Sequence, residues 1–391
     1  MSQNTKQIIK FIFRDIIQFI SRFRSLDKNT VLIVRLDAMG DYVLFRNFLE
    51  DLRMSEKYKD KKIILCGLEQ WRDLAIAYDG HLIDEFIWFN WSQFFSSYAY
   101  KFRIIKSLRR FRAYEIIYPI YGRYSEMDFL LGLLGGAEVI APNLGEDCVS
   151  GVTEAQLRRR HKSYTKIIQT LPDTHFEYYR NASFMSQLTG VENTDRKLHI
   201  NVIKSTFNKN KIGIIAGAGD AVRCWSAKNF VAVLQSIYAK YPQSEFVLLG
   251  HLSDSAAAAQ YILANIPQHF PLENKVGATH TAEFCVAIAD CKLLISNETS
   301  GVHIAAAVGT PAVCISNGNH FGRFNPYKEP LATNITTIYP DESFYATEKY
   351  LENCAKYRYG SALDINLIES EKVASAAYKY LEIIFSNHVT K

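Results

Sequence analysis

The sequence lacks the cysteine spacing of a zinc ribbon or a thioredoxin-like enzyme. No two of its 7 cysteines have C-x-x-C spacing, so neither motif is expected. Their odd number and their place in apolar runs are typical of reduced thiols in the cytosol. The N-terminus has no unbroken apolar core followed by a small-residue cleavage site, so no secretory signal is predicted.

Long apolar runs and strong charge are also missing. No run of about 18 apolar residues could span a bilayer. The net charge of +5 is mild, its cations are spread along the chain, and no nucleic-acid-binding motif occurs, so no nucleic-acid partner is expected. No Asp-x-Asp motif follows a predicted strand, so no metal site is expected. No resident cofactor is expected either. The 23 Tyr and 24 Phe are many; most should serve packing, and exposed ones would suit stacking on sugars.

Apolar runs alternate with helical patterns, which predicts parallel sheets covered on both faces. Over 391 residues, 48% of them hydrophobic, two doubly wound α/β domains are expected, with a linker at 192–211. Predicted strands are 31–36, 62–67, 84–88, 114–119 and 137–140, then 212–216, 245–250, 292–296 and 312–315. Predicted helices include 42–54 and 97–111, then 226–240, 253–265, 281–290 and 366–386. The polar stretch 146–175, with its Arg158–His161 cluster, is expected to be a solvated helix or loop, or to bind acidic groups.

Four segments follow predicted strand ends, where ligands bind in doubly wound sheets. The most informative, Asn297-Glu298-Thr299-Ser300-Gly301-Val302-His303, places a carboxylate, two hydroxyls and a glycine at a helix start. Such a start suits a phosphate, because its N–H groups and dipole favour anions; an ordinary N-cap is the alternative. The other three are Leu36-Asp37-Ala38-Met39-Gly40-Asp41, Gly217-Ala218-Gly219 with Arg223-Cys224-Trp225, and Ser316 to Arg323.

In this order the four segments resemble glycosyltransferase family 9, the heptosyltransferases of lipopolysaccharide core assembly. The resemblance covers roughly residues 30 to 330 and implies the GT-B architecture, in which two Rossmann-like domains face a cleft. The chain departs from the family pattern at four positions. Asp37 replaces a Ser or Thr, Arg223 a Lys, Glu298 an Asp and Ser300 a Gly. The predicted division is a basic helix (1–28), an acceptor-side domain (29–200), a nucleotide-sugar domain (211–365) and a C-terminal helix (366–391).

The second domain supplies the candidate donor-binding residues. Glycines let backbone N–H groups approach a diphosphate closely, and Arg223 can bind it bidentately. Glu298 could accept hydrogen bonds from sugar or ribose hydroxyls, Asp254 could touch the nucleoside, and the family pattern keeps His303 near the donor; packing is the alternative for that histidine. The predicted donor set is Gly217, Ala218, Gly219, Arg223, Asp254, Glu298, Thr299, Ser300, Gly301 and His303.

Asp41 is the candidate catalytic base, because it matches the family's catalytic carboxylate and could deprotonate an acceptor hydroxyl. One base and direct displacement imply inversion at the anomeric carbon. Asp37 is a rival base, and a helix cap is the alternative role for Asp41. Gly40 and Asp37 complete the predicted acceptor side.

Residues 5–25 form a predicted amphipathic helix with an Ile/Phe stripe. The helix has a net charge of +4, because it carries five cations and one acidic residue, Asp15; the cations are Lys6, Lys10, Arg14, Arg22 and Arg24. Such a helix suits an anionic membrane surface, although packing on the first domain is equally consistent with the pattern.

The predicted function is therefore an inverting glycosyltransferase peripheral to the inner face of the cytoplasmic membrane. It would move heptose or a related sugar from a nucleotide-sugar such as ADP-heptose, a substrate rather than a cofactor, to a lipid-linked or cell-envelope saccharide. A nucleotide-sugar epimerase and a non-catalytic sugar-nucleotide-binding or membrane-associated assembly protein are the alternatives.

Overall fold

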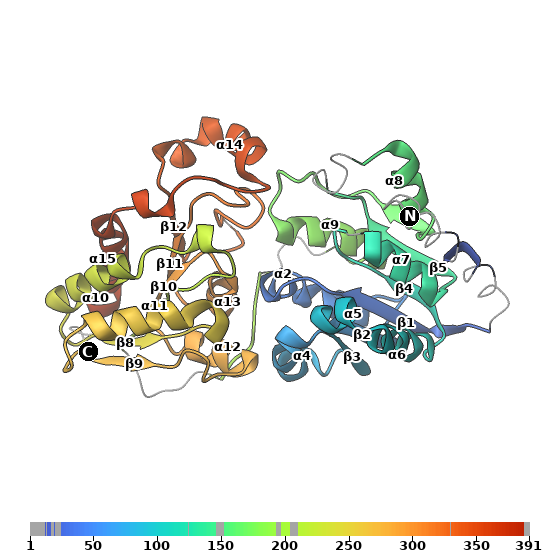
Figure 1. The fold of residues 1–391 in the computed structure, drawn as a ribbon, viewed down its shortest axis with the longest axis horizontal. Helices are drawn as coiled ribbons and strands as arrows, with labels where there is room; N and C mark the ends of the chain where they lie inside the picture. The colour runs from blue at the N-terminus through green and yellow to red at the C-terminus, as the bar shows by residue number, and fades with distance from the viewer. Residues whose placement is uncertain are drawn as a thin grey trace. The chain divides into compact units, whose positions relative to one another are not determined.

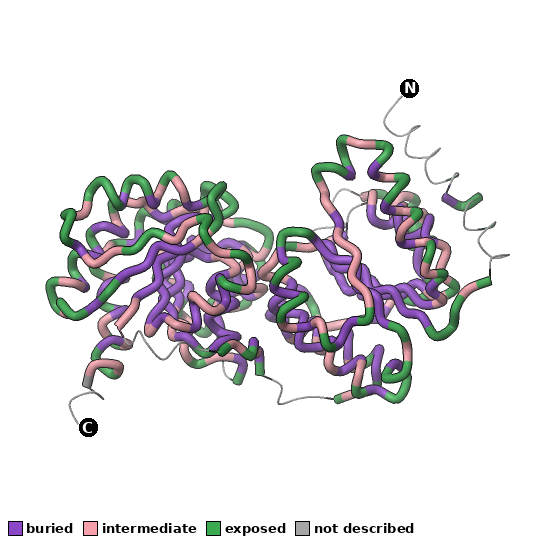
Figure 2. Tube along the Cα trace, turned by 90° about the horizontal axis from the view of Figure 1, so that it is seen from below, coloured by how far each residue is buried: buried purple, intermediate pink, exposed green. Residues whose placement is uncertain are grey.

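A computed structural model describes residues 12, 14–16, 19, 25–123, 125–145, 152–192, 197–203, 210–328 and 330–386. The chain divides into two compact units. Unit 1 comprises residues 1–173 and 178–193, and unit 2 comprises residues 174–177 and 194–391. In each unit the buried residues follow the strands (Figure 2).

Unit 1 is built on a six-stranded parallel sheet of order β3-β2-β1-β4-β5-β6 (Figure 1). Its strands are β1 (Asp27–Arg35), β2 (Lys62–Leu68), β3 (Glu85–Phe89), β4 (Ala113–Ile117), β5 (Glu138–Pro142) and β6 (Lys166–Ile168). Its α-helices are α2 (Met39–Val43), α3 (Leu49–Met54), α4 (Arg72–Asp79), α5 (Trp91–Ser96), α6 (Tyr98–Arg109), α7 (Ser125–Leu134), α8 (Glu154–His161) and α9 (Glu177–Thr189).

Unit 2 carries a second six-stranded parallel sheet, of order β12-β11-β10-β7-β8-β9. Its strands are β7 (Lys211–Ile215), β8 (Glu245–Leu248), β9 (Leu272–Asn274), β10 (Leu293–Asn297), β11 (Ala312–Ile315) and β12 (Ile335–Ile338). Figure 1 shows the α-helices on both sides of this sheet: α10 (Ala227–Lys240), α11 (Leu252–Asn265) and α15 (Ser370–Ser386) on one, α12 (Thr281–Ala289) and α13 (Ser300–Val308) on the other. Helix α14 (Tyr350–Tyr357) lies beyond the sheet.

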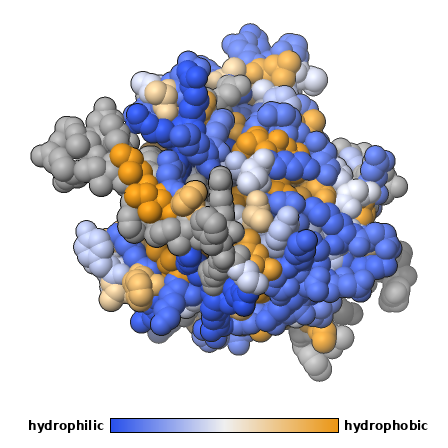
Figure 3. All heavy atoms as spheres, turned by 90° about the vertical axis from the view of Figure 1, so that its right-hand side faces the viewer, coloured by the Kyte–Doolittle hydropathy of each residue, from blue (hydrophilic) through white to orange (hydrophobic). Residues whose placement is uncertain are grey.

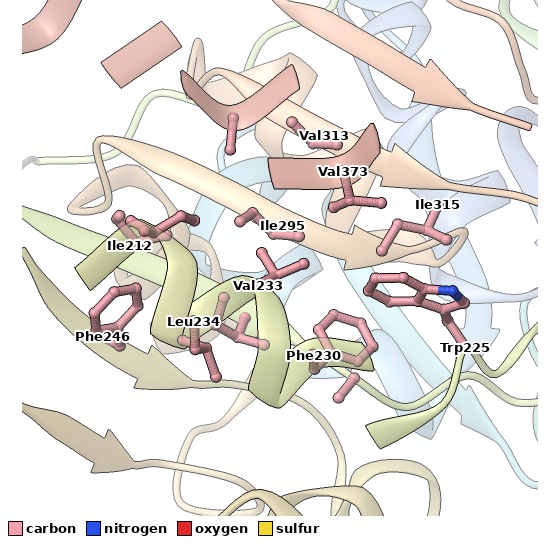
Figure 4. Packing of buried hydrophobic residues seen from close by; sticks show 14 of the residues in the cluster. Ile212, Trp225, Phe230, Val233, Leu234, Phe246, Ile295, Val313, Ile315 and Val373 are labelled. Carbon is pink, nitrogen blue, oxygen red and sulfur yellow. The ribbon is translucent and has the colours of Figure 1, made fainter. Parts of the chain in front are cut away.

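The apolar runs of the sequence become the cores of these sheets, because a parallel strand covered on both faces needs apolar residues at every position. All five residues of β10 are buried, for example. In unit 2, Trp225, Phe230 and Val373 pack from the loop after β7, from α10 and from α15 onto the strands (Figure 4). The C-terminal helix thus belongs to the core of unit 2.

One segment was assigned wrongly from the sequence. The polar stretch 146–175, expected to be a helix or loop, contains strand β6 in addition to α8. This strand has three residues, and only Ile168 among them is buried. An edge strand of that length carries too few apolar positions to produce a recognisable pattern.

Strand order reverses once in each sheet. In unit 1 the reversal lies between β1 and β4, which pair in parallel. In unit 2 it lies between β7 and β10. From the two strands of such a pair, the chain connections lead to opposite sides of the sheet. Doubly wound sheets bind their ligands beyond the carboxyl ends of that pair. These two reversal points are therefore where a site should be sought.

Candidate functional site

The loops at the reversal point of unit 2 are joined by Asn297, the last residue of β10. Its Nδ2 donates to the Ala216 carbonyl oxygen at 2.8 Å, and its Oδ1 accepts from the Trp225 N–H at 3.2 Å. The indole of Trp225 points into the core and donates to the Ile368 carbonyl at 3.0 Å. Asn297, which the sequence analysis did not select, thus fixes the predicted donor loop against β10. Its place at the head of the Asn-Glu-Thr-Ser block was the available signal.

Gly217 is required by a close approach of two loops. A Cβ there would lie 2.2 Å from the Asp254 carbonyl oxygen and 2.4 Å from Ser255 Oγ, at the start of α11. The glycine therefore brings the segment 217–219 against the residues that follow β8. Asp254 itself has an exposed side chain that accepts a hydrogen bond from Ser253. The structure thus places Asp254 beside the predicted donor loop.

Arg223 ends a short 3₁₀ helix, η4 (Ala221–Arg223), and reaches across to β10. Its Nη1 donates to the Glu298 carbonyl oxygen at 3.2 Å, and a Cβ on Gly219 would lie 3.8 Å from its Nη2. Within the described residues its buried Nε has no hydrogen-bond partner. The guanidinium therefore lies between the glycine loop and the start of α13, where it could bind an anion.

Thr299 is the N-cap of α13, and its hydroxyl accepts from the Gly301 N–H at 3.2 Å. The capping role weighed from the sequence is thus present. It coexists with anion binding, since a cap occupies only one of the unpaired N–H groups at a helix start. Gly301 is needed for packing, because a Cβ there would lie 2.3 Å from Ile215 Cδ1. Ser300 is the first helical residue and is half-buried.

Glu298 is 4% exposed, and its carboxylate is bound within the unit. It accepts a hydrogen bond from the Ser316 hydroxyl, and that hydroxyl also accepts from the Gly318 N–H at 3.0 Å. Burial raises the pKa of Glu298 to about 7, although Ser316, Arg223 and Asn325 oppose the shift. The side chain therefore joins the loop after β10 to the loop after β11. A direct contact with a sugar hydroxyl stays a prediction.

We expect this carboxyl to make stability depend on pH. Between the usual glutamate pKa and about 7 the folded chain keeps a proton that the unfolded chain loses, so stability should fall as pH rises through that interval. The loss is on the order of 3 kcal/mol at about 1.4 kcal/mol per pKa unit. Glu298→Gln should remove this pH dependence of stability. The melting temperature of the wild type, relative to that of the variant, should drop between pH 5 and pH 8; Glu348→Gln, at an exposed position, is the control. Parallel wild-type and Glu298→Gln curves would contradict this assignment.

His303 is packed inside α13. It is 5% exposed, its Nδ1 lies 2.7 Å from the Tyr327 hydroxyl, and Phe324 lies against its ring. Burial lowers the pKa of His303 to about 4, so the imidazole is neutral at physiological pH. The packing alternative is thus what the structure displays, and a position near the donor stays a prediction.

Asn317 is a second residue that the sequence analysis did not select. Its Nδ2 donates to the carbonyl oxygens of Val222, Ser361 and Leu363 at 3.1, 3.3 and 3.2 Å. The loop after β11 is thereby tied to η4 and to the segment before α15. The side chain supports the backbone that carries Arg223. Its signal was its place in the segment Ser316 to Arg323.

At the reversal point of unit 1, Asp37 forms an ion pair with a buried arginine. Arg35 Nε and Nη2 contact the two Asp37 carboxylate oxygens at 3.0 and 2.8 Å, and Nη2 also donates to the Asp41 carbonyl oxygen at 3.1 Å. Arg35 is fully buried, so Asp37 compensates a charge that would otherwise be costly to bury. This arrangement gives Asp37 a structural role and makes it a weaker candidate for the base.

Asp41 lies in the first turn of α2 and is half-buried. The N-cap position of that helix is Ala38, two residues after Leu36, so Asp41 does not occupy the capping position considered from the sequence. The Arg35 contact to its carbonyl oxygen fixes its backbone. Gly40 precedes it within the same helical turn.

The basic cluster Arg158–His161 does not act as one surface. Arg160 is buried, forms an ion pair with Asp128 at 2.5 Å and donates to the Arg123 carbonyl oxygen at 2.6 Å. Arg158 pairs with Glu154 one turn away on the exposed side of α8. Arg160 therefore stabilises unit 1, and recognition of acidic groups is left to the exposed members.

Solved structures support the fold. A glycosyl transferase family 9 structure from Veillonella parvula aligns with a TM-score of 0.68 and 16% identity over 91% of this chain and 98% of that one. The E. coli ADP-heptose lps heptosyltransferase II aligns with a TM-score of 0.65 and 15% identity over 90% of this chain and 98% of that one. E. coli heptosyltransferase WaaC with ADP-2-deoxy-2-fluoro heptose aligns with a TM-score of 0.65 and 12% identity over 90% of this chain and 99% of that one. No curated protein sequence matched the chain.

The two doubly wound units define the chain as a protein of the GT-B fold. Residues 164–353 match the sequence model of glycosyltransferase family 9 (heptosyltransferase). This match confirms the resemblance for the three motifs that lie within residues 164–353, whereas the motif Leu36 to Asp41 lies outside it. Together with the fold, the match indicates a glycosyltransferase similar to family 9.

Proposed function

We propose that the protein transfers a sugar, with inversion, from a nucleotide-diphosphate donor to a saccharide of the cell envelope. The observation that carries this proposal is the placement of the motifs. Gly217 to Arg223 and Glu298 to Gly301 follow the two strands at the reversal point of unit 2, and Gly40-Asp41 follows β1 at that of unit 1. In each unit, motif residues thus lie at the position where a doubly wound sheet binds a ligand.

In the proposed reaction the acceptor oxygen attacks the anomeric carbon as the bond from that carbon to the diphosphate breaks. Asp41 takes the proton of the acceptor hydroxyl. Arg223 and the N-terminus of α13 stabilise the charge that gathers on the departing diphosphate, in a geometry fixed before the reaction starts. A single displacement inverts the anomeric configuration. No resident cofactor takes part in this proposal.

ADP-heptose is the donor we propose to test first, because one E. coli structure with the same fold is named an ADP-heptose lps heptosyltransferase and another is a heptosyltransferase with ADP-2-deoxy-2-fluoro heptose. Arg223 in place of the family lysine, and a buried Glu298, change the donor side, so related donors belong in the same screen. A thermal-shift screen of nucleotide-sugars identifies the donor. A catalytically inactive binding protein would bind such a donor and transfer nothing from it.

We further propose that the N-terminal segment holds the enzyme at the cytoplasmic face of a membrane. Most of the predicted helix 5–25 lies outside the described residues. Of its described part, Ile12, Ile16 and Phe19 are 54%, 51% and 59% exposed, whereas Arg14 is fully buried. Arg14 donates to the Arg159 carbonyl and to Ser163 Oγ at 2.8 and 2.9 Å. Arg14 thereby attaches this segment to unit 1, while the three described apolar side chains are exposed.

Two findings bear on this surface. No helix in the part of the chain that the structure describes is long and apolar enough to cross a bilayer. Figure 3 shows apolar residues gathered in patches on a largely hydrophilic face. An interfacial helix needs an exposed apolar side together with cations for anionic lipid, and Lys6, Lys10, Arg22 and Arg24 belong to the same sequence segment.

Replacing Ile12, Ile16 and Phe19 together by Gln should weaken binding to anionic vesicles at least about tenfold, because burial of each apolar side chain contributes about 1.5–3 kcal/mol when complete. A chain shortened to begin at Lys28 should bind as weakly. Co-sedimentation with vesicles that contain phosphatidylglycerol measures the effect. Leu351→Gln, at a position 67% exposed in unit 2, is the matched control. Equal sedimentation of all variants would show that the segment only packs on unit 1.

A further inference from the structure

Trp91, the first residue of α5, lies beside the turn that carries Asp37 and Asp41. Its indole Nε1 donates to the Leu36 carbonyl oxygen at 3.2 Å, and Leu36 directly precedes Asp37. Helix α5 begins two residues after β3, so this side chain extends along the carboxyl edge of the sheet from β3 to the end of β1. The hydrogen bond fixes the half-buried ring next to the proposed catalytic turn.

Phe95 stacks on Trp91 on the outer side of the same helix. The ring centroids lie 5.4 Å apart with an interplanar angle of 13°, and Phe95 is 61% exposed. The neighbouring Phe94, in contrast, is buried and packs against Phe89 at 5.0 Å. Core packing therefore explains Phe94 and leaves Phe95 unexplained. Trp91 and Phe95 together form a partly exposed pair, here called the aromatic platform.

Polar groups border the aromatic platform. Asn90 is the N-cap of α5, and its Oδ1 accepts from the Gln93 N–H at 3.0 Å. Its Nδ2 donates to Glu69 Oε2 at 2.7 Å. Glu69 and Gln93 are exposed. An acceptor carboxylate and two amides thus stand beside an apolar stacking surface.

We propose that the aromatic platform binds one sugar ring of the acceptor saccharide, next to Asp41; this inference rests on the proposed function. A sugar has apolar C–H faces, which pack on aromatic rings, and hydroxyl edges, which bond to carboxylates and amides; the aromatic platform and its border present both kinds of group. Tryptophan is also enriched among the residues that dominate binding at protein interfaces. An anionic lipid surface fits less well, because Glu69 would repel it.

The platform is tested by steady-state kinetics with a water-soluble acceptor, the de-acylated core oligosaccharide of the cell envelope. Phe95→Ala should raise the acceptor KM about tenfold, the effect expected when one aromatic contact is lost, and should leave kcat and the donor KM unchanged. Phe95→Tyr should restore the acceptor KM, because it keeps the ring. Phe102→Ala, at another exposed phenylalanine (71%) on α6, is the matched control and should behave as wild type.

Three outcomes would overturn the inference. One is an unchanged acceptor KM in Phe95→Ala. Another is an equal increase in Phe102→Ala. The third is an effect of Phe95→Ala that occurs only with lipid-bound acceptor in vesicles, since the aromatic platform would then contact lipid. Wild-type activity separates these results from failure of the proposed function, in which the wild type itself transfers no sugar from any nucleotide-sugar. Melting temperatures confirm that the exposed substitutions leave the fold intact.

Discussion

Asp41→Asn should lower the rate of sugar transfer by about 10²–10⁴-fold, the range usual for a positioned general base. The amide keeps the shape of the carboxylate but cannot accept the proton of the acceptor hydroxyl. Nucleotide-sugar affinity should change little, because the residues predicted to bind the donor belong to unit 2. Rates from a discontinuous transfer assay and affinities from calorimetry measure the two quantities.

Asp37→Asn is the matched control for that substitution. It removes the charge that compensates buried Arg35, so its main effect should be a lower melting temperature rather than a specific loss of rate. Near wild-type turnover in Asp41→Asn, together with a rate loss and a normal melting temperature in Asp37→Asn, would exchange the roles of the two residues.

Arg223→Ala should weaken binding of the nucleotide-sugar by about 10- to 100-fold, since loss of a charged hydrogen bond costs about 1.5–3 kcal/mol. Arg223→Lys should lose less, because a cation remains while the bidentate geometry is lost. Calorimetric titration with the donor, and with its nucleoside diphosphate, measures both variants.

Lys379→Ala, at an exposed position on α15, is the control for a nonspecific effect of net charge. Equal donor affinities in the wild type, Arg223→Ala and Arg223→Lys would mean that the guanidinium serves only to hold the Glu298 carbonyl. A loss shared by Lys379→Ala would point to long-range attraction instead of a contact.

Much of the fold could be predicted, because strands covered on both faces are continuous apolar runs. Strands β7 and β10 are examples, and their predicted and observed limits agree within one residue at each end. Three edge strands of only three or four residues, β6, β9 and β12, were not predicted, whereas the longer edge strand β3 was. The first residue of β9 is only partly buried and the other two are exposed, and its sequence carries no alternation from which to infer a strand.

Within the candidate site, proximity was predictable where residues are close in the chain, as in the turn from β1 to Asp41. Contacts between distant segments were not predictable. Nothing local indicates that the Ser316 hydroxyl binds Glu298, or that a tryptophan after β3 donates to Leu36 at the end of β1. These contacts depend on which strands are neighbours in the sheet, and periodicity does not determine that order. They decide whether a polar side chain can face a ligand or is occupied within the protein.

The central claim is inverting transfer from a nucleotide-sugar, and the anomeric configuration of the product tests it most directly. The donor chosen by thermal shift is incubated with the wild-type protein and de-acylated core oligosaccharide, and the product is examined by proton NMR. We predict release of the nucleoside diphosphate and one new glycosidic bond of anomeric configuration opposite to that of the donor. A product with retained configuration, or release of nucleotide without a new glycosidic bond, would contradict the account.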